Sequence, residues 1–212
     1  MYFKVLFMNE QQQSLEELQH IKQMMEKSSR FISLSGLSGI AAGTVAILGA
    51  LLGAKMISDY VNESGISYNT LVTELIVVAI TVMALALVSG FVFTYLRSKR
   101  NGVSIWGATT YRLVLNLAIP LVAGGFLLLR LMQLHYVSLI APGCLLFYGL
   151  ALVNASKYTL GEVRYLGYCE LILAIINLWV PAHGLIFWTV GFGLLHIIYG
   201  IIMWRKYERV TF

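Results

Sequence analysis

Charged residues are scarce in this chain. Asp, Glu, Lys and Arg make up only 12% of its 212 residues, whereas 58% are hydrophobic. A soluble domain has about 25% charged residues, so this composition is typical of an integral membrane protein. The formal net charge is +5, but the basic residues lie at the ends of apolar segments. That pattern indicates membrane topology, and we expect no nucleic-acid partner.

Signals of cofactor chemistry are also missing. Cys144 and Cys169 lie inside apolar runs without the spacing of a zinc or redox motif, and we expect both to be buried free thiols. His135 and His183 lack the further ligands that a metal site needs. There is no hydrolase elbow, P-loop or dinucleotide fingerprint. We therefore expect a non-enzymatic protein with no cofactor and no metal.

Long apolar runs dominate the rest of the sequence. A helix that crosses a bilayer needs about 20 mostly apolar residues. Six runs meet this need, at 31–54, 71–96, 112–131, 135–155, 163–180 and 183–204. They predict an all-α, polytopic membrane helical bundle of six transmembrane helices over 31–204, with an N-terminal segment at 1–30 and a tail at 205–212. Because no apolar run precedes Phe31, no cleavable signal peptide is evident.

The basic residues orient this bundle. Two of the fifteen, Lys55 and Arg130, fall on one side of the predicted membrane. The other side holds Lys4, Lys22, Lys27, Arg30, Arg97, Lys99, Arg100, Arg112, Lys157, Arg164, Arg205, Lys206 and Arg209. Positively charged loops stay in the cytoplasm, so we expect both termini to be cytoplasmic. Trp106, Trp179 and Trp204 lie near span ends, as in an aromatic belt.

An amphipathic helix is predicted at 14–30. Ser14 and Glu17 have the form of a capping box. The apolar stripe has 3-4-3-4 spacing and consists of Leu18, Ile21, Met25, Ser28 and Ile32. This helix would lie on the membrane surface or against the bundle. Alternatively, it would dock a cytoplasmic protein partner or a second copy of the chain.

Small residues in the first span predict close helix packing. Gly39 and Gly43 are four residues apart, as are Gly49 and Gly53. This spacing lets the backbones of two membrane helices approach each other. Because five other spans are available, packing within the chain is favoured over homo-oligomer formation.

The last spans carry a faint internal repeat. "FYGLALVNASKY" and "IYGIIMWRKYE" each end a span with Tyr-Gly followed by basic residues, and Pro181 and Gly184 predict a tight turn between the last two spans. We expect three helical hairpins. The spans from "YRLVLNLAIPLVAGG" through "LIAPGCLLFYGLALVNASKY" to "LGYCELILAIINLWVPAHGLIFWTVGFGLLHIIYGIIMW" resemble a family of uncharacterised six-span bacterial integral membrane proteins. More loosely, the last hairpin is similar to that of HdeD-type acid-resistance membrane proteins. These resemblances imply a bacterial inner-membrane location and a role in stress tolerance.

A few polar residues interrupt the predicted spans. Glu170 lies about 9 Å along its helix from Arg164, and His196 on the antiparallel neighbour falls in the same half of the membrane. A buried carboxylic acid next to an imidazole can relay a proton. Asn116, Asn154 and Asn177 complete this candidate intramembrane polar site. We expect Glu170 to face the bundle interior and to be protonated or hydrogen-bonded at neutral pH.

Two functions follow from these features. The first is a non-enzymatic membrane scaffold or stress-tolerance protein that docks a cytoplasmic partner through its amphipathic helix. The second is a small proton-linked transporter or channel that uses Glu170 and His196. A third hypothesis, a membrane enzyme that acts on lipids, is supported only by scattered His and Glu residues.

Overall fold

The computed structural model describes residues 34–62, 65, 67–102 and 105–209. The α-helices are α2 (Gly36–Asn62), α3 (Tyr68–Arg100), α4 (Ala108–Gln133), α5 (Ile140–Ala155), α6 (Glu162–Trp179), α7 (Gly184–Trp188) and α8 (His196–Tyr207). Short 3-10 turns are η1 (Val137–Leu139), η2 (Ser156–Tyr158) and η3 (Pro181–His183), and η4 (Thr189–Leu195) is π-helical. The predicted all-helical fold is confirmed for the described residues. The amphipathic helix at 14–30 lies outside them.

Five helical segments are long and apolar enough to cross a membrane. They are Gly36–Asn62, Tyr68–Arg100, Ala108–Gln133, Val137–Tyr158 and Pro181–Tyr207, with 27, 33, 26, 22 and 27 residues. Most extend beyond the ranges predicted from apolar runs, because polar residues continue the helices past the apolar windows. The remaining long helix, α6, has 18 residues and carries three charged residues within them, Glu162, Arg164 and Glu170.

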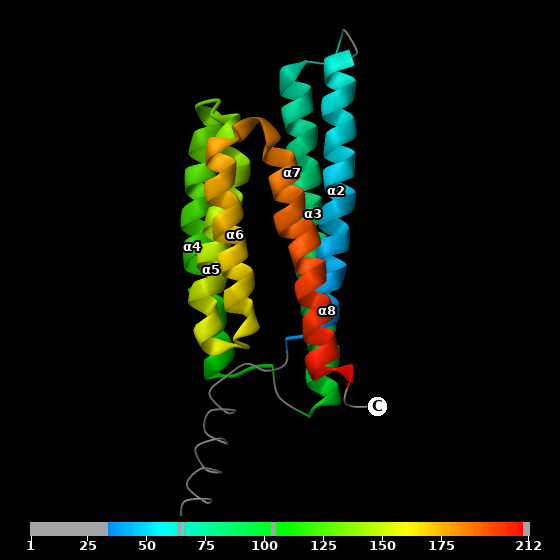
Figure 1. The fold of residues 1–212 in the computed structure, drawn as a ribbon, viewed down its shortest axis with the longest axis vertical. Coiled ribbons are helices and arrows are strands. Elements are labelled where there is room, and N and C mark those ends of the chain that lie inside the picture. The colour runs from blue at the N-terminus through cyan, green and yellow to red at the C-terminus, as the bar shows by residue number, and fades with distance from the viewer. Residues whose placement is uncertain (1–33, 63–64, 66, 103–104, 210–212) are drawn as a thin grey trace, which may run out of the picture.

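The long helices form two groups that stand side by side (Figure 1). One group contains α4, α5 and α6, and the other contains α2, α3 and the last segment, which runs through α7, η4 and α8. Each central helix packs on both of its neighbours: α5 lies between α4 and α6, and α2 lies between α3 and α8. The last segment joins the groups, since α7 packs on α5 while η4 contacts both α2 and α6. Thus α6 packs more extensively on α5 than on the helix that follows it in sequence.

Glycines of α2 make its contact with η4 and α8. A methyl group added at Gly39 would lie 3.1 Å from the carbonyl oxygen of His196, and one at Gly43 would lie 2.6 Å from that of Gly193. The other two glycines of the predicted motif face α3, where Gly49 meets Val82 and Gly53 meets Leu75. The small residues of α2 therefore serve two different helix contacts on two faces.

The outer surface of the bundle is strongly apolar. Along α3, only Leu71 and Ser98 are buried, and large side chains such as Leu87 and Phe91 are more than half exposed. A surface of this kind is suited to lipid rather than water. The prediction that both cysteines are buried was wrong, because Cys169 is exposed and Cys144 is partly exposed. Cys169 precedes the buried Glu170, and because consecutive residues of an α-helix are about 100° apart, it lies off the buried face of α6.

Candidate functional site

Glu170 lies inside the bundle, with a side chain that is 0% exposed. It belongs to a buried stripe of α6 that includes Leu166, Ala174 and Asn177. These residues are spaced by three or four positions, so they share one face of the helix. Burial of this face against α5 and the last segment carries the carboxyl group away from lipid and from water.

Room for the carboxyl group comes from Gly191 in the π-helical segment η4. A methyl group built at Gly191 would lie 2.5 Å from Oε2 of Glu170 and 2.5 Å from a methyl carbon of Leu145 on α5. Any residue larger than glycine at this position would therefore displace the side chains of Glu170 and Leu145. A π-helical turn inside an α-helix often occurs at functional sites, and here it lies directly against the buried acid.

His196 follows this turn and is 7% exposed. Its Nδ1 lies 2.9 Å from the carbonyl oxygen of Gly191, and its Nε2 lies 2.7 Å from the hydroxyl of Tyr148 on α5. Because a carbonyl oxygen can only accept, Nδ1 must carry a proton. In the neutral ring Nε2 then accepts the hydrogen bond that Tyr148 donates. The contacts thus assign the tautomer of His196.

Glu170 and His196 are close but not hydrogen-bonded. Oε1 of Glu170 lies 3.7 Å from Nδ1 of His196, which is too long for a hydrogen bond. Among the described residues, neither carboxyl oxygen of Glu170 has a hydrogen-bond partner. An ionised carboxylate in such a site has a high free energy, so the arrangement favours the neutral acid. The structure therefore brings Glu170 and His196 together, as the antiparallel arrangement of their helices suggested, but without a hydrogen bond between them.

Tyr199 extends the polar group toward the basic end of the bundle, where α3 ends and α6 begins. It lies one turn after His196 on α8. Tyr148 and Tyr199 both pack against the same buried cluster of Leu152, Val163 and Leu166. The hydroxyl of Tyr199 is buried and has no hydrogen-bond partner within the described part of the chain. Sequence reasoning noted the paired Tyr-Gly motifs but gave neither tyrosine a role.

The three asparagines are not part of this cluster. Asn154 on α5 donates to the backbone carbonyl of Asn116 on α4 at 3.0 Å, so this pair joins two helices. Asn177 is fully buried and donates to the carbonyl oxygen of Val180 at 3.1 Å, which supports the end of α6. It lies two turns from Glu170, or about 10 Å at 1.5 Å per residue. The structure therefore divides the predicted polar site into three separate places.

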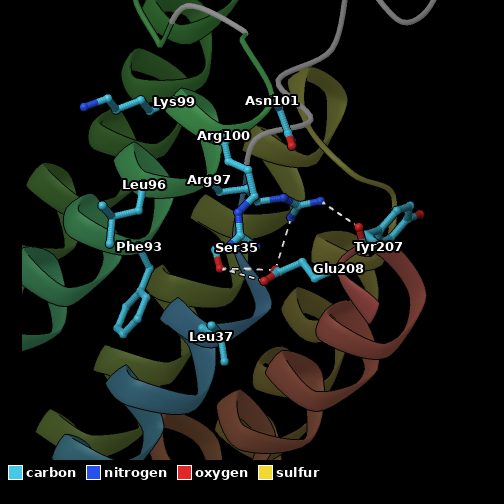
Figure 2. A pocket seen from close by; sticks show the side chains of 10 residues that line it. All are labelled: Ser35, Leu37, Phe93, Leu96, Arg97, Lys99, Arg100, Asn101, Tyr207 and Glu208. Carbon is cyan, nitrogen blue, oxygen red and sulfur yellow. Dashed lines mark hydrogen bonds and ion pairs between the residues drawn. The ribbon is translucent and has the colours of Figure 1, made fainter. Parts of the chain in front are cut away.

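A second glutamate, which is partly buried, was missed by the sequence analysis. Glu208 accepts hydrogen bonds from the backbone N–H of Gly36 at 2.6 Å and from the hydroxyl of Ser35 at 3.1 Å. Its Oε1 also lies 3.3 Å from the Arg97 guanidinium, which reaches the carbonyl oxygens of Leu34 and Tyr207 as well. Figure 2 shows these groups converging where α2 begins and α3 and α8 end.

This arrangement has a simple physical basis. The first N–H groups of a helix lack partners within the helix and carry a partial positive charge. A carboxylate next to them is therefore stabilised, and the guanidinium on its other side neutralises its charge. Ser35 directly before the glycine-rich helix is a recognisable start signal. No signal in the sequence links it to a glutamate 173 residues further along the chain.

Comparison with known proteins gives no assignment. No family model, curated protein or solved structure matches this chain. Among the described residues, no group of three or more His, Cys, Asp and Glu side chains is placed to hold a metal ion. The chemistry of the site must therefore be argued from its own residues.

Proposed function

We propose that this chain is a six-span protein of the bacterial cytoplasmic membrane in which Glu170 and His196 carry protons. Five apolar segments support the membrane location, and α6 serves as the fifth span because it lies packed along α5. The excess of basic residues at one end of the bundle supports a cytoplasmic position for both termini. The protein would act without an enzymatic reaction, as a small proton-linked transporter or channel.

The observation that carries this proposal is the unpartnered carboxyl group of Glu170. Buried polar groups in proteins are nearly always hydrogen-bonded, and an exception calls for an explanation. Ionisable residues inside membranes mark proton or substrate routes by default. Glu170 has no partner within the described part of the chain, yet a titratable imidazole lies 3.7 Å away.

The contacts of His196 define the proton step. A proton that reaches Nε2 from the Tyr148 side converts the neutral ring to an imidazolium. Glu170, a neutral acid at rest, must first release its own proton. Nδ1 then gives its proton to the resulting carboxylate, which becomes a neutral acid again and leaves a neutral ring protonated at Nε2. This transfer requires the distance of 3.7 Å to shorten, so the side chain of His196 must leave the carbonyl oxygen of Gly191. The π-helical turn supplies a weak point for that movement.

The proposal is tested with Glu170→Gln in proteoliposomes. Proton entry is followed with an internal pH dye while a potassium diffusion potential drives it. We expect wild-type protein to carry protons faster than empty liposomes, and Glu170→Gln to reduce the rate to that of empty liposomes. The matched control is Glu74→Gln, because Glu74 lies exposed near the start of α3. Equal proton flux in wild type and Glu170→Gln would refute the proposal.

A second measurement separates the carboxyl group from transport. The infrared carboxylic acid band that Glu170→Gln removes should change in intensity with bulk pH in the wild type. If the band is constant and flux is unchanged, Glu170 only packs. A non-enzymatic scaffold or stress-tolerance protein, with its amphipathic helix as a docking site for a cytoplasmic partner, would then be the better proposal. That outcome would also fit the loose resemblance of the last hairpin to acid-resistance proteins.

A further inference from the structure

A groove opens at the basic end of the bundle, between the last turns of α3 and the start of α2. It encloses about 460 Å³, within the range of about 300–1,000 Å³ that small-ligand sites span. Tyr207 and Glu208 close one side of it. The groove therefore lies beside the Arg97–Glu208 ion pair and at the other end of α8 from His196.

The groove carries an excess of positive charge. Arg97 and Glu208 neutralise each other, because their charged atoms lie 3.3 Å apart. Lys99 and Arg100 line the same groove and add two formal positive charges. Lys99 is exposed and makes no side-chain hydrogen bond or ion pair with the described residues. An anionic ligand would thus meet a cation whose charge is not already compensated.

The opposite end of the groove is apolar. Phe93 and Leu96 line it from α3 and Leu37 lines it from α2, and Leu37 and Leu96 are 39% and 55% exposed. Phe93 lies six residues before Lys99, which corresponds to about 9 Å along the helix. In Figure 2, Phe93 and Leu37 lie toward the bundle, whereas Lys99, Arg100 and Asn101 lie at the helix end. The groove therefore changes from apolar to basic along the direction of the spans.

We propose that this groove binds one anionic phospholipid of the leaflet at the basic end. Its phosphate lies near Lys99 and Arg100, and the start of one acyl chain covers Leu37, Phe93 and Leu96. Basic pockets between membrane helices are known to hold anionic headgroups. A soluble phosphate would contact only the basic end of the groove, whereas a phospholipid contacts the basic end with its phosphate and the apolar end with its acyl chain. This inference does not depend on the proposed role of Glu170.

The test is equilibrium binding of fluorescent phosphatidylglycerol to the full chain in detergent, with fluorescent phosphatidylcholine as the neutral comparison. We expect saturable binding of phosphatidylglycerol only. Lys99→Glu should weaken this binding by about tenfold or more, because it replaces a cation with an anion near the phosphate. The matched control is Lys55→Glu, which makes the same change at an exposed lysine of the opposite end and should leave the affinity unchanged.

Free glycerol phosphate distinguishes the two sources of a phosphate group. In millimolar excess it should fail to displace the fluorescent lipid, because it lacks the acyl chain that the apolar end contacts. Displacement at that concentration would overturn the assignment in favour of a soluble phosphate. Equal affinity for the two lipids would also overturn it, as would equal weakening by the Lys99 and Lys55 variants.

Discussion

The fully buried Glu170 and the partly buried Glu208 differ in their contacts. Glu208 accepts hydrogen bonds from Gly36 and Ser35 and pairs with Arg97. Glu170 is more deeply buried, at 0% exposure against 15% for Glu208. It nevertheless has no hydrogen-bond partner among the residues that the structure describes.

The difference separates an acid with structural contacts from the acid on which the proposed function rests. The contacts of Glu208 compensate for the loss of hydration, so its charge holds three helix ends together. The site of Glu170 offers no such compensation, so the folded protein retains a carboxyl group that destabilises it when ionised. A buried polar group without a partner breaks a general rule of protein structure, and such exceptions are expected where function requires them. The contrast predicts that removing the two carboxyl groups changes stability in opposite directions.

The largest effect is expected for Glu208→Met. This change leaves Arg97 largely buried without its carboxylate and leaves the N–H of Gly36 without an acceptor. Loss of one partner of a buried ion pair costs about 3–5 kcal/mol; since Arg97 is 11% exposed, we expect the free energy of unfolding to fall by about 2–3 kcal/mol. Denaturation of the protein by SDS in mixed micelles measures this value.

Glu162→Met is the matched control for that experiment. Glu162 pairs with Lys206, whose side chain is 56% exposed, and exposed ion pairs contribute at most about 1 kcal/mol. If both substitutions lowered the free energy of unfolding equally, Glu208 would be no more than another surface acid.

The sequence predicted much more of the fold than of these sites. Apolar runs of sufficient length predicted the five helical segments that are long and apolar enough to cross a membrane, because lipid requires such runs. Glu170 and His196 were also found, since polar residues stand out in apolar runs. The Arg97–Glu208 contact was not found, because it joins chain segments that approach only after the helices pack. The position of Gly191 under Glu170 depends on a π-helical turn, which no apolar pattern encodes.

A smaller effect of opposite sign is expected for Glu170→Met. Methionine has a similar length and no polar atom that needs a partner, and it is flexible enough to fit beside Gly191. Because the wild-type carboxyl group is buried without a hydrogen bond, its removal should raise the free energy of unfolding by about 1 kcal/mol. The same SDS denaturation measures it. A loss as large as that of Glu208→Met would mean that Glu170 has a stabilising partner after all.

An effect of similar size is expected for the hydrogen bond between Tyr148 and His196. Tyr148→Phe removes only the hydroxyl that lies 2.7 Å from Nε2 of His196, so we expect a loss of about 1 kcal/mol in the free energy of unfolding. The nitrogen NMR shift of Nε2 should move toward the value of a free acceptor. Nδ1 should stay protonated, since Gly191 still accepts from it.

Tyr199→Phe provides the comparison for this change. It removes a hydroxyl that is also buried but has no partner in the described part of the chain, so the free energy of unfolding should stay constant or rise slightly. The His196 ring shifts should not change. If Tyr199→Phe instead shifted Nε2 as strongly as Tyr148→Phe, the hydrogen bond to His196 would come from Tyr199, and the proton step through Tyr148 would be wrong.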